Sequence, residues 1–241
     1  MIRMILVELQ KLKGSLALAL ALLAPALPGF LAFLSLLNAQ SSPRWASVFG
    51  EFVLPLWALF LLPMVIAAFT TLVGQIEYRT RGWDHILALP VPRWQIFTAK
   101  MIVILGANMA MTIFVLVYAW AGAALGGALG GHAPIGPIPW ASVSERVGWL
   151  LASSTMLVVI QTWVALRIVS FVVPLSVGIA GTLVTLAVAM TRTDEADWFP
   201  WVLPQRAMLV PDPLPVAVLG GVGGAFLLAL MVYDLSRRQF R

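Results

Sequence analysis

Six stretches without a charged side chain recur along the sequence, and each has the length of about 20 residues that a helix needs to cross a hydrocarbon core of about 30 Å. They cover residues 16–37, 52–74, 101–125, 147–166, 168–190 and 214–233. Within a bilayer only helices and closed barrels satisfy their own backbone, and these stretches lack the alternating pattern of barrel strands. The sequence therefore predicts an all-α integral membrane protein with six transmembrane helices.

The composition agrees with a membrane as the solvent of this chain. Hydrophobic residues make up 61% of the 241 residues and charged residues 10%, which leaves too few polar groups to cover a water-soluble globule. Only short polar joints separate the apolar stretches, so we expect a single transmembrane domain over residues 1–241. The net charge of +5 comes from clusters at the ends of these stretches, and we expect no nucleic-acid partner.

The basic residues also predict the orientation. Of the 15 Lys and Arg residues, only Arg44, Arg146, Arg192 and Arg206 fall on one side of the predicted membrane, and the other eleven fall on the opposite side. Because Lys and Arg accumulate in cytoplasmic joints, both termini are predicted to be cytoplasmic. The expected location is the bacterial inner membrane.

Two segments outside the stretches have a predicted role in the architecture. In residues 1–15, Ile2, Ile5, Leu9 and Leu12 recur at helical spacing among charged residues, which predicts a helix along the inner membrane surface. The outer loop, residues 191–213, combines acidic residues, tryptophans and prolines, so we expect it to be ordered but irregular. It is the largest candidate surface for a molecule arriving from outside.

The joint at residues 75–99 carries the most informative pattern. Trp83, Ile86, Leu87 and Pro90 follow the spacing i, i+3, i+4 and i+7, so a short helix here would present one apolar ridge with charged edges. Such a ridge suits docking into a groove of a partner protein. The alternative is an interfacial loop whose apolar face touches lipid headgroups.

The string from Glu77 to Arg93, followed by Lys100, resembles the joint between the second and third spans of type-2 ABC exporter permeases, most closely the small six-helix permeases of bacteriocin-immunity and bacitracin-resistance exporters. The segment from Val7 to Lys13 resembles the start of that family. The resemblance implies a dimer with a second permease, identical or homologous, and two copies of a cytoplasmic ABC ATPase subunit. It also implies that residues 1–15 form an elbow helix and residues 75–99 a coupling segment. The implied ATPase-coupling residues are Glu77, Arg79, Arg81, Trp83, Asp84, Ile86, Leu87, Pro90 and Arg93.

The chain lacks the means for enzymatic chemistry of its own. It contains no G-x-x-x-x-G-K-[ST] loop, so ATP and Mg are expected in the partner ATPase and no cofactor in this chain. Without cysteine, and with His85 and His132 isolated from one another, no metal site is expected. An intramembrane enzyme would need an activated nucleophile or paired carboxylates, and no such motif is present.

Polar residues inside the stretches are the candidates for a substrate pathway. They are Asn108, Gln161, Ser153, Ser154 and Thr155. Hydrogen bonding between helices is the competing role for each. Three glycine pairs at a spacing of four, Gly122 with Gly126, Gly127 with Gly131, and Gly220 with Gly224, predict close helix packing.

The function that these features favour is the permease subunit of an ATP-driven exporter. Its cargo would be a hydrophobic or amphipathic compound, with an antimicrobial peptide or a drug among the candidates. An ion-coupled secondary transporter is the first alternative, although such carriers usually place ionisable groups within the bilayer and none lies inside the six stretches. A membrane scaffold without transport and an intramembrane enzyme remain the others, and the sequence leaves cargo, direction and partner permease open.

Overall fold

The computed structural model describes residues 1–80, 90–191 and 195–238, and within these ranges every regular element is a helix. Six helical segments are long and apolar enough to cross a membrane, which confirms the all-α architecture with six candidate spans. The helices are α1 (Ile2–Leu12), α2 (Leu16–Leu23), α3 (Ala26–Leu37), α4 (Trp45–Ser47), α5 (Leu54–Leu56), α6 (Leu62–Thr80), α8 (Arg93–Gly130), α9 (Trp140–Arg167), α10 (Val172–Thr191), α11 (Leu203–Leu209) and α12 (Leu214–Arg237).

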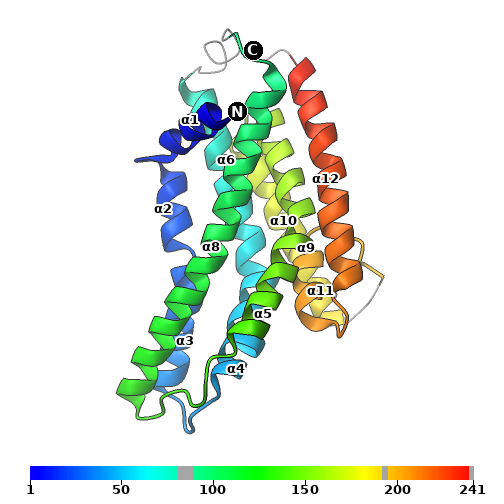
Figure 1. Cartoon of the computed structure of the whole chain (residues 1–241). Helices are drawn as coiled ribbons and strands as arrows, with labels where there is room; N and C mark the ends of the chain where they lie inside the picture. The colour runs from blue at the N-terminus through cyan, green and yellow to red at the C-terminus, as the bar shows by residue number, and fades with distance from the viewer. Residues whose placement is uncertain (81–89, 192–194, 239–241) are drawn as a thin grey trace.

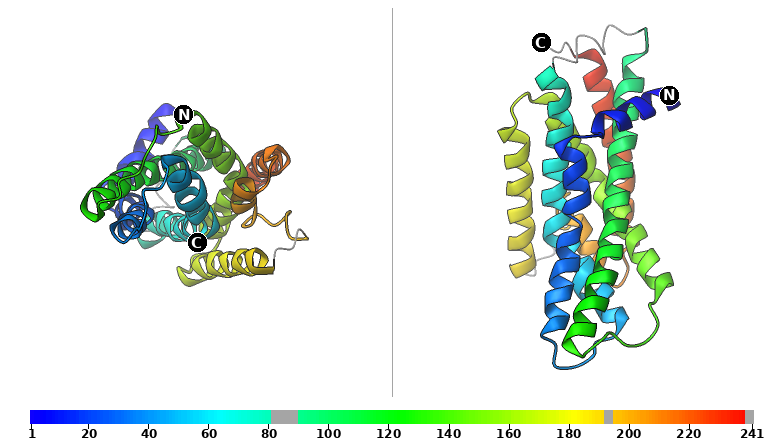
Figure 2. Two further views of the ribbon diagram at one scale, coloured as in Figure 1. Left: turned by 90° about the horizontal axis from the view of Figure 1, so that it is seen from below. Right: turned by 90° about the vertical axis from the view of Figure 1, so that its left-hand side faces the viewer.

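The spans stand side by side as one bundle, and α1 lies at the same end as the C-terminal end of α12 (Figure 1). The end of α6 and the start of α8 lie there too. This end, which we call the α1 end, therefore gathers both terminal helices and the two borders of the predicted coupling segment. Helix α10 stands at the edge of the bundle, where it packs on α6 (Figure 2).

Helix α1 crosses the end of the bundle at a steep angle to the spans (Figure 2). The chain turns at Gly14, whose φ of 72° lies in the left-handed region that glycine adopts without a steric penalty. Ser15 then caps the first membrane helix by accepting a hydrogen bond from the backbone N–H of Leu18. The helix predicted for residues 1–15 is thus present, and its place on a membrane surface stays a prediction.

The second span contains two π-helical segments, η1 (Val48–Val53) and η2 (Trp57–Leu61). Each comes shortly before a proline, Pro55 or Pro63, that has no N–H to give to the preceding turn. Carbonyl groups upstream of these prolines lose the N–H donor of a normal α-helical turn. In the wider π-helical turn they accept a hydrogen bond from an N–H one residue further along the chain. The span Trp45–Arg79 nevertheless stays helical throughout.

The observed spans are mostly longer than the predicted ones. The first, Leu16–Leu37, has the predicted bounds, whereas the third extends over Arg93–Gly130 instead of 101–125. The prediction began the third stretch after Lys100, but α8 begins at Arg93, because a helix continues through charge where it emerges from the membrane. At 1.5 Å per residue, the 38 residues of α8 extend over about 57 Å, well beyond a hydrocarbon core of about 30 Å.

The predicted start of the fifth span at residue 168 was wrong by four residues. Ile168 has an extended backbone at the end of α9, and α10 begins at Val172. Ser170 explains the new start, because its hydroxyl accepts a hydrogen bond from the Val172 N–H.

Two of the three predicted glycine pairs bring helices together. A Cβ on Gly122 would lie 2.1 Å from the carbonyl oxygen of Gly29, so α8 and α3 touch through their backbones. A Cβ on Gly220 would lie 2.4 Å from the carbonyl oxygen of Ser153, which makes the same kind of contact between α12 and α9. The third pair was wrong: Gly131, with φ of 77°, ends α8 and packs against no other helix.

Candidate functional site

The predicted coupling segment is shorter than the joint read from the sequence. Residues 75–80 belong to α6 and residues 93–99 to α8, so only residues 81–92 connect the two helices. Five of the proposed ATPase-coupling residues lie outside the described part of the chain, namely Arg81, Trp83, Asp84, Ile86 and Leu87. Their apolar ridge stays a prediction.

The other four proposed coupling residues lie at the borders of this segment, and three of them are exposed. Arg79 ends the second span, and Pro90 and Arg93 precede and begin α8. Arg93 donates a hydrogen bond to the backbone oxygen of Arg238, at a distance of 3.2 Å, and so links the start of α8 to the end of α12. Glu77 differs from these three because only 1% of its surface is exposed.

Glu77 belongs to a cluster of four charged side chains, the ion-pair cluster, made of Glu8, Lys11, Glu77 and Lys100, of which Lys11 alone is partly exposed. The Lys100 ammonium lies 2.5 Å from Glu8 Oε2 and 2.7 Å from Glu77 Oε1. Lys11 repeats the pattern, at 2.5 Å from Glu8 Oε1 and 3.0 Å from Glu77 Oε1. Three helices, α1, α6 and α8, thus meet through one charged network.

The ion-pair cluster is electrically balanced, with two carboxylates and two ammonium groups. The side chains of Lys100 and Glu77 are 2% and 1% exposed, so removal of either leaves its partners charged in a poorly hydrated place. Burial by itself raises the pKa of the Glu8 carboxyl, but the attraction of Lys100 and Lys11 outweighs burial, and the pKa lies below its usual value. Glu8 is therefore held in its charged form.

A second polar link joins α9 and α12 at the same end of the bundle. Asp234 forms an ion pair with Arg167 and accepts a hydrogen bond of 2.8 Å from the indole N–H of Trp163. Arg238 donates to the backbone oxygen of Arg167. Together with the ion-pair cluster and Arg93, this link gives the α1 end more cross-helix ion pairs than the rest of the described chain shows.

Sequence reasoning missed Glu8, Lys11 and Lys100 as site residues. A signal was available, because Glu8 is the only carboxylate in α1 and lies next to the apolar positions Ile5, Leu9 and Leu12 at helical spacing. A charge at the edge of an apolar face needs a partner wherever that face is covered. The sequence could not show which partner, because Glu77 and Lys100 are distant along the chain.

The proposed pathway residues lie inside the bundle. Asn108 donates a hydrogen bond of 3.1 Å to Ser154, between α8 and α9, and Gln161 donates one of 2.6 Å to the backbone oxygen of Pro174 in α10. Ser153 and Thr155 bond to carbonyl groups of their own helix. The oxygens Asn108 Oδ1 and Gln161 Oε1 are buried without a hydrogen-bond partner in the described part of the chain.

The outer loop, residues 191–213, is more regular and more buried than expected. It contains α11, and Trp201 within it is 5% exposed because its ring packs against Gly181 of α10. Asp197 and Arg206 form an ion pair of 2.9 Å across the loop. Trp198 remains exposed, so of the two tryptophans in this loop only Trp198 is accessible from outside the bundle.

Comparisons with known proteins agree with the architecture. The family model described as "ABC-2 family transporter protein" matches residues 4–200, which includes most of α1, the ion-pair cluster and the first five spans. No curated protein and no solved structure matches the chain. Permeases of this family work in the membrane with an ABC ATPase. The chain therefore belongs to the ABC-2 transporter family, as a multi-pass membrane permease of an ABC transporter.

Proposed function

We propose that this permease exports a hydrophobic or amphipathic compound, such as an antimicrobial peptide or a drug, from the bacterial inner membrane. A second permease, identical or homologous, pairs with it, and two ATPase subunits bind at the α1 end and use ATP and Mg. In this arrangement both termini are cytoplasmic, α1 is the elbow helix and residues 81–92 form the coupling segment. The observation that carries the proposal is the ion-pair cluster, which ties α1, α6 and α8 together where this segment leaves the bundle.

The cluster explains how a push on the coupling segment would reach the membrane. Residues 81–92 connect α6 directly to α8, so closure of the ATPase displaces the ends of both helices. Because Lys100 of α8 is paired with both Glu77 of α6 and Glu8 of α1, the three helices would move as one unit. Glu77 thus acts as a positioning residue, while Arg79, Arg81, Trp83, Asp84, Ile86, Leu87, Pro90 and Arg93 form the proposed contact with the ATPase.

The proposed cargo pathway runs along the helices that the rigid unit would move. Asn108, Ser153, Ser154 and Thr155 lie on α8 and α9, and Gln161 bonds to α10. The hydrogen bonds from Asn108 to Ser154 and from Gln161 to Pro174 hold these helices together, and the five side chains would meet cargo when the helices separate. The apolar character of the spans suits a lipid-soluble molecule.

The proposal is tested by measuring whether the permease assembles with the ATPase and stimulates its ATP hydrolysis. Arg81→Glu combined with Trp83→Ala should abolish co-purification of the ATPase, because it removes one charge contact and one apolar anchor. A matched control, Arg44→Glu with Trp140→Ala, makes the same changes at the opposite end and should leave assembly intact. Normal binding and cargo-stimulated ATP hydrolysis in the first variant would refute the coupling assignment. Transport by the permease without an ATPase would favour an ion-coupled carrier instead.

A further inference from the structure

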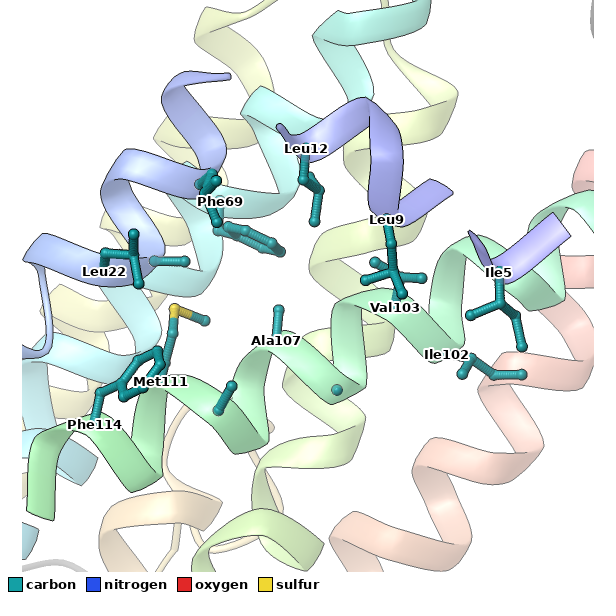
Figure 3. A pocket seen from close by; sticks show the side chains of 14 residues that line it. Ile5, Leu9, Leu12, Leu22, Phe69, Ile102, Val103, Ala107, Met111 and Phe114 are labelled. Atoms are coloured by element: carbon teal, nitrogen blue, oxygen red, sulfur yellow. The ribbon is translucent and has the colours of Figure 1, made fainter. Parts of the chain in front are cut away.

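An apolar cavity of about 430 Å³ lies beneath α1, between that helix, α2 and α8 (Figure 3). Ile5 and Leu9 of α1 form its roof, Leu22 of α2 and Phe114 of α8 lie toward one end, and Phe69 of α6 also lines it. Its volume falls within the range of about 300–1,000 Å³ typical of small-molecule pockets.

The chemistry of the cavity excludes polar occupants. All of its lining residues are apolar or glycine, so water inside it would find no hydrogen-bond partner among the side chains. None of the four side chains of the ion-pair cluster is among the lining residues, so the cluster contributes no charge to the cavity wall. An occupant must therefore be a hydrocarbon-like group.

The position of the mouth identifies which hydrocarbon can enter. Three lining residues from three different helices, Leu9, Leu22 and Ile102, are also among the exposed large hydrophobic side chains. The cavity thus opens on the outer surface of the bundle, just below a helix with the character of an interfacial helix. In a bilayer, an opening at this depth is in contact with lipid acyl chains, so an acyl chain is the hydrocarbon that can enter.

The charges of α1 identify the headgroup. Arg3 and Lys13 are exposed cations at the two ends of α1, next in sequence to the part of the helix that roofs the cavity. Neither belongs to the ion-pair cluster, in contrast to Lys11. Basic residues at a membrane surface attract anionic lipids.

We propose that the cavity beneath α1 is a lipid site that holds one acyl chain of an anionic phospholipid, with the headgroup beside α1, where Arg3 and Lys13 supply positive charge. The chain fills space between α1, α2 and α8 that the protein itself leaves empty. The site faces lipid on the side of α8 away from its polar contact with α9, so it is separate from the proposed cargo pathway. It also does not depend on the ATPase.

Gly106 offers a variant that fills the cavity without a clash. It lines the cavity, and a Cβ at this position would meet no atom within 4 Å. Gly106→Leu therefore places a side chain into the space of the acyl chain. Gly148→Leu is the matched control, because Gly148 is exposed, has equally open surroundings and lies on α9 away from the cavity.

The experiment uses the full chain in nanodiscs with phosphatidylglycerol that carries a photoreactive group in one acyl chain. After irradiation, mass spectrometry maps the labelled residues. We expect labels concentrated on the cavity residues of α1, α2 and α8, loss of these labels in Gly106→Leu, and unchanged labels in Gly148→Leu. Unlabelled phosphatidylglycerol should saturate the cavity label, which separates a site from bulk lipid even if Gly106→Leu folds poorly.

A second arm tests the headgroup with photoreactive phosphatidylcholine. Wild-type chain should label less with this lipid than with phosphatidylglycerol, and Arg3→Gln with Lys13→Gln should remove the difference. Absence of cavity labels in the wild type, persistence of them in a folded Gly106→Leu variant, or equal labelling by both lipids would overturn the proposal. Shielding of the mouth by a second copy, seen as crosslinks between Leu9→Cys chains with no lipid label, would overturn it as well.

Discussion

At the scale of residues, four charged side chains decide how the α1 end is organised. Lys100 and Glu77 are almost fully buried and each contacts two partners of opposite charge. A buried ion pair adds little net stability compared with apolar residues, but loss of one member is costly because it leaves a charge unpaired. The cluster therefore determines which helices pack together and adds little to the free energy of unfolding.

Lys100→Met should destabilise the permease by about 3–5 kcal/mol, since Glu8 and Glu77 then share Lys11 alone in a buried site. The double variant Glu77→Gln with Lys100→Met restores the balance of charge and should recover most of this loss. Thermal unfolding followed by tryptophan fluorescence measures both. Equal unfolding temperatures for the single variant and the wild type would show that the cluster is not a unit.

The lowered pKa of Glu8 predicts that the stability of the folded protein depends on pH in the acidic range. Its pKa is lower in the folded protein than the ordinary 4.5, so the folded state binds fewer protons than the unfolded state near and below that pH. The contribution of Glu8 to stability is therefore present above its unfolded pKa and is lost as pH falls through the folded pKa. The unfolding temperature of wild type should fall more steeply below pH 4.5 than that of Glu8→Gln. Parallel curves would contradict the assignment.

At the scale of elements, close contacts between helices depend on glycines, which have no side chain, as much as on larger residues. Gly122 and Gly126 let α8 approach α3, where a Cβ would lie 2.1 Å and 2.3 Å from backbone oxygens. Close approach of this kind is how membrane helices pack when lipid is as apolar as the side chains. The 3.6-residue period placed both glycines on one face in advance, while Gly131 shows that spacing does not separate a packing pair from a helix end.

Gly122→Ala should destabilise the permease by about 1–3 kcal/mol, because the added methyl group forces α3 and α8 apart. Gly106→Ala is the control on the same helix. Its Cβ meets open space, so the change should be neutral or stabilising by up to about 1 kcal/mol through its better helix propensity. Unfolding curves of the two variants in one detergent give the comparison.

At the scale of the whole molecule, the even number of spans places both ends of the chain on one side (Figure 1). The ion-pair cluster, the link between Arg167 and Asp234, and the borders of residues 81–92 share that side. The proposed ATPase contact lies at this end of the bundle, and the opposite end carries the loops around His132 and α11 (Figure 1).

The orientation can be measured directly because the sequence contains no cysteine. Ala133→Cys, in the loop opposite to α1, should react with a membrane-impermeant maleimide in intact cells. Gln10→Cys, exposed on α1, should react only after the membrane is opened. The reverse pattern would place residues 81–92 on the side without ATP and contradict the proposed exporter.

The sequence by itself determined the six spans and their order, because a bilayer leaves a run of apolar residues no alternative to a helix. It also indicated the helix over residues 1–15, which is a local property of the apolar spacing. Only the tertiary structure decided that Glu77 is buried with Glu8, Lys11 and Lys100, and that Trp201 packs against α10. These contacts join residues far apart in the chain, and local periodicity carries no information about which faces of separate helices meet.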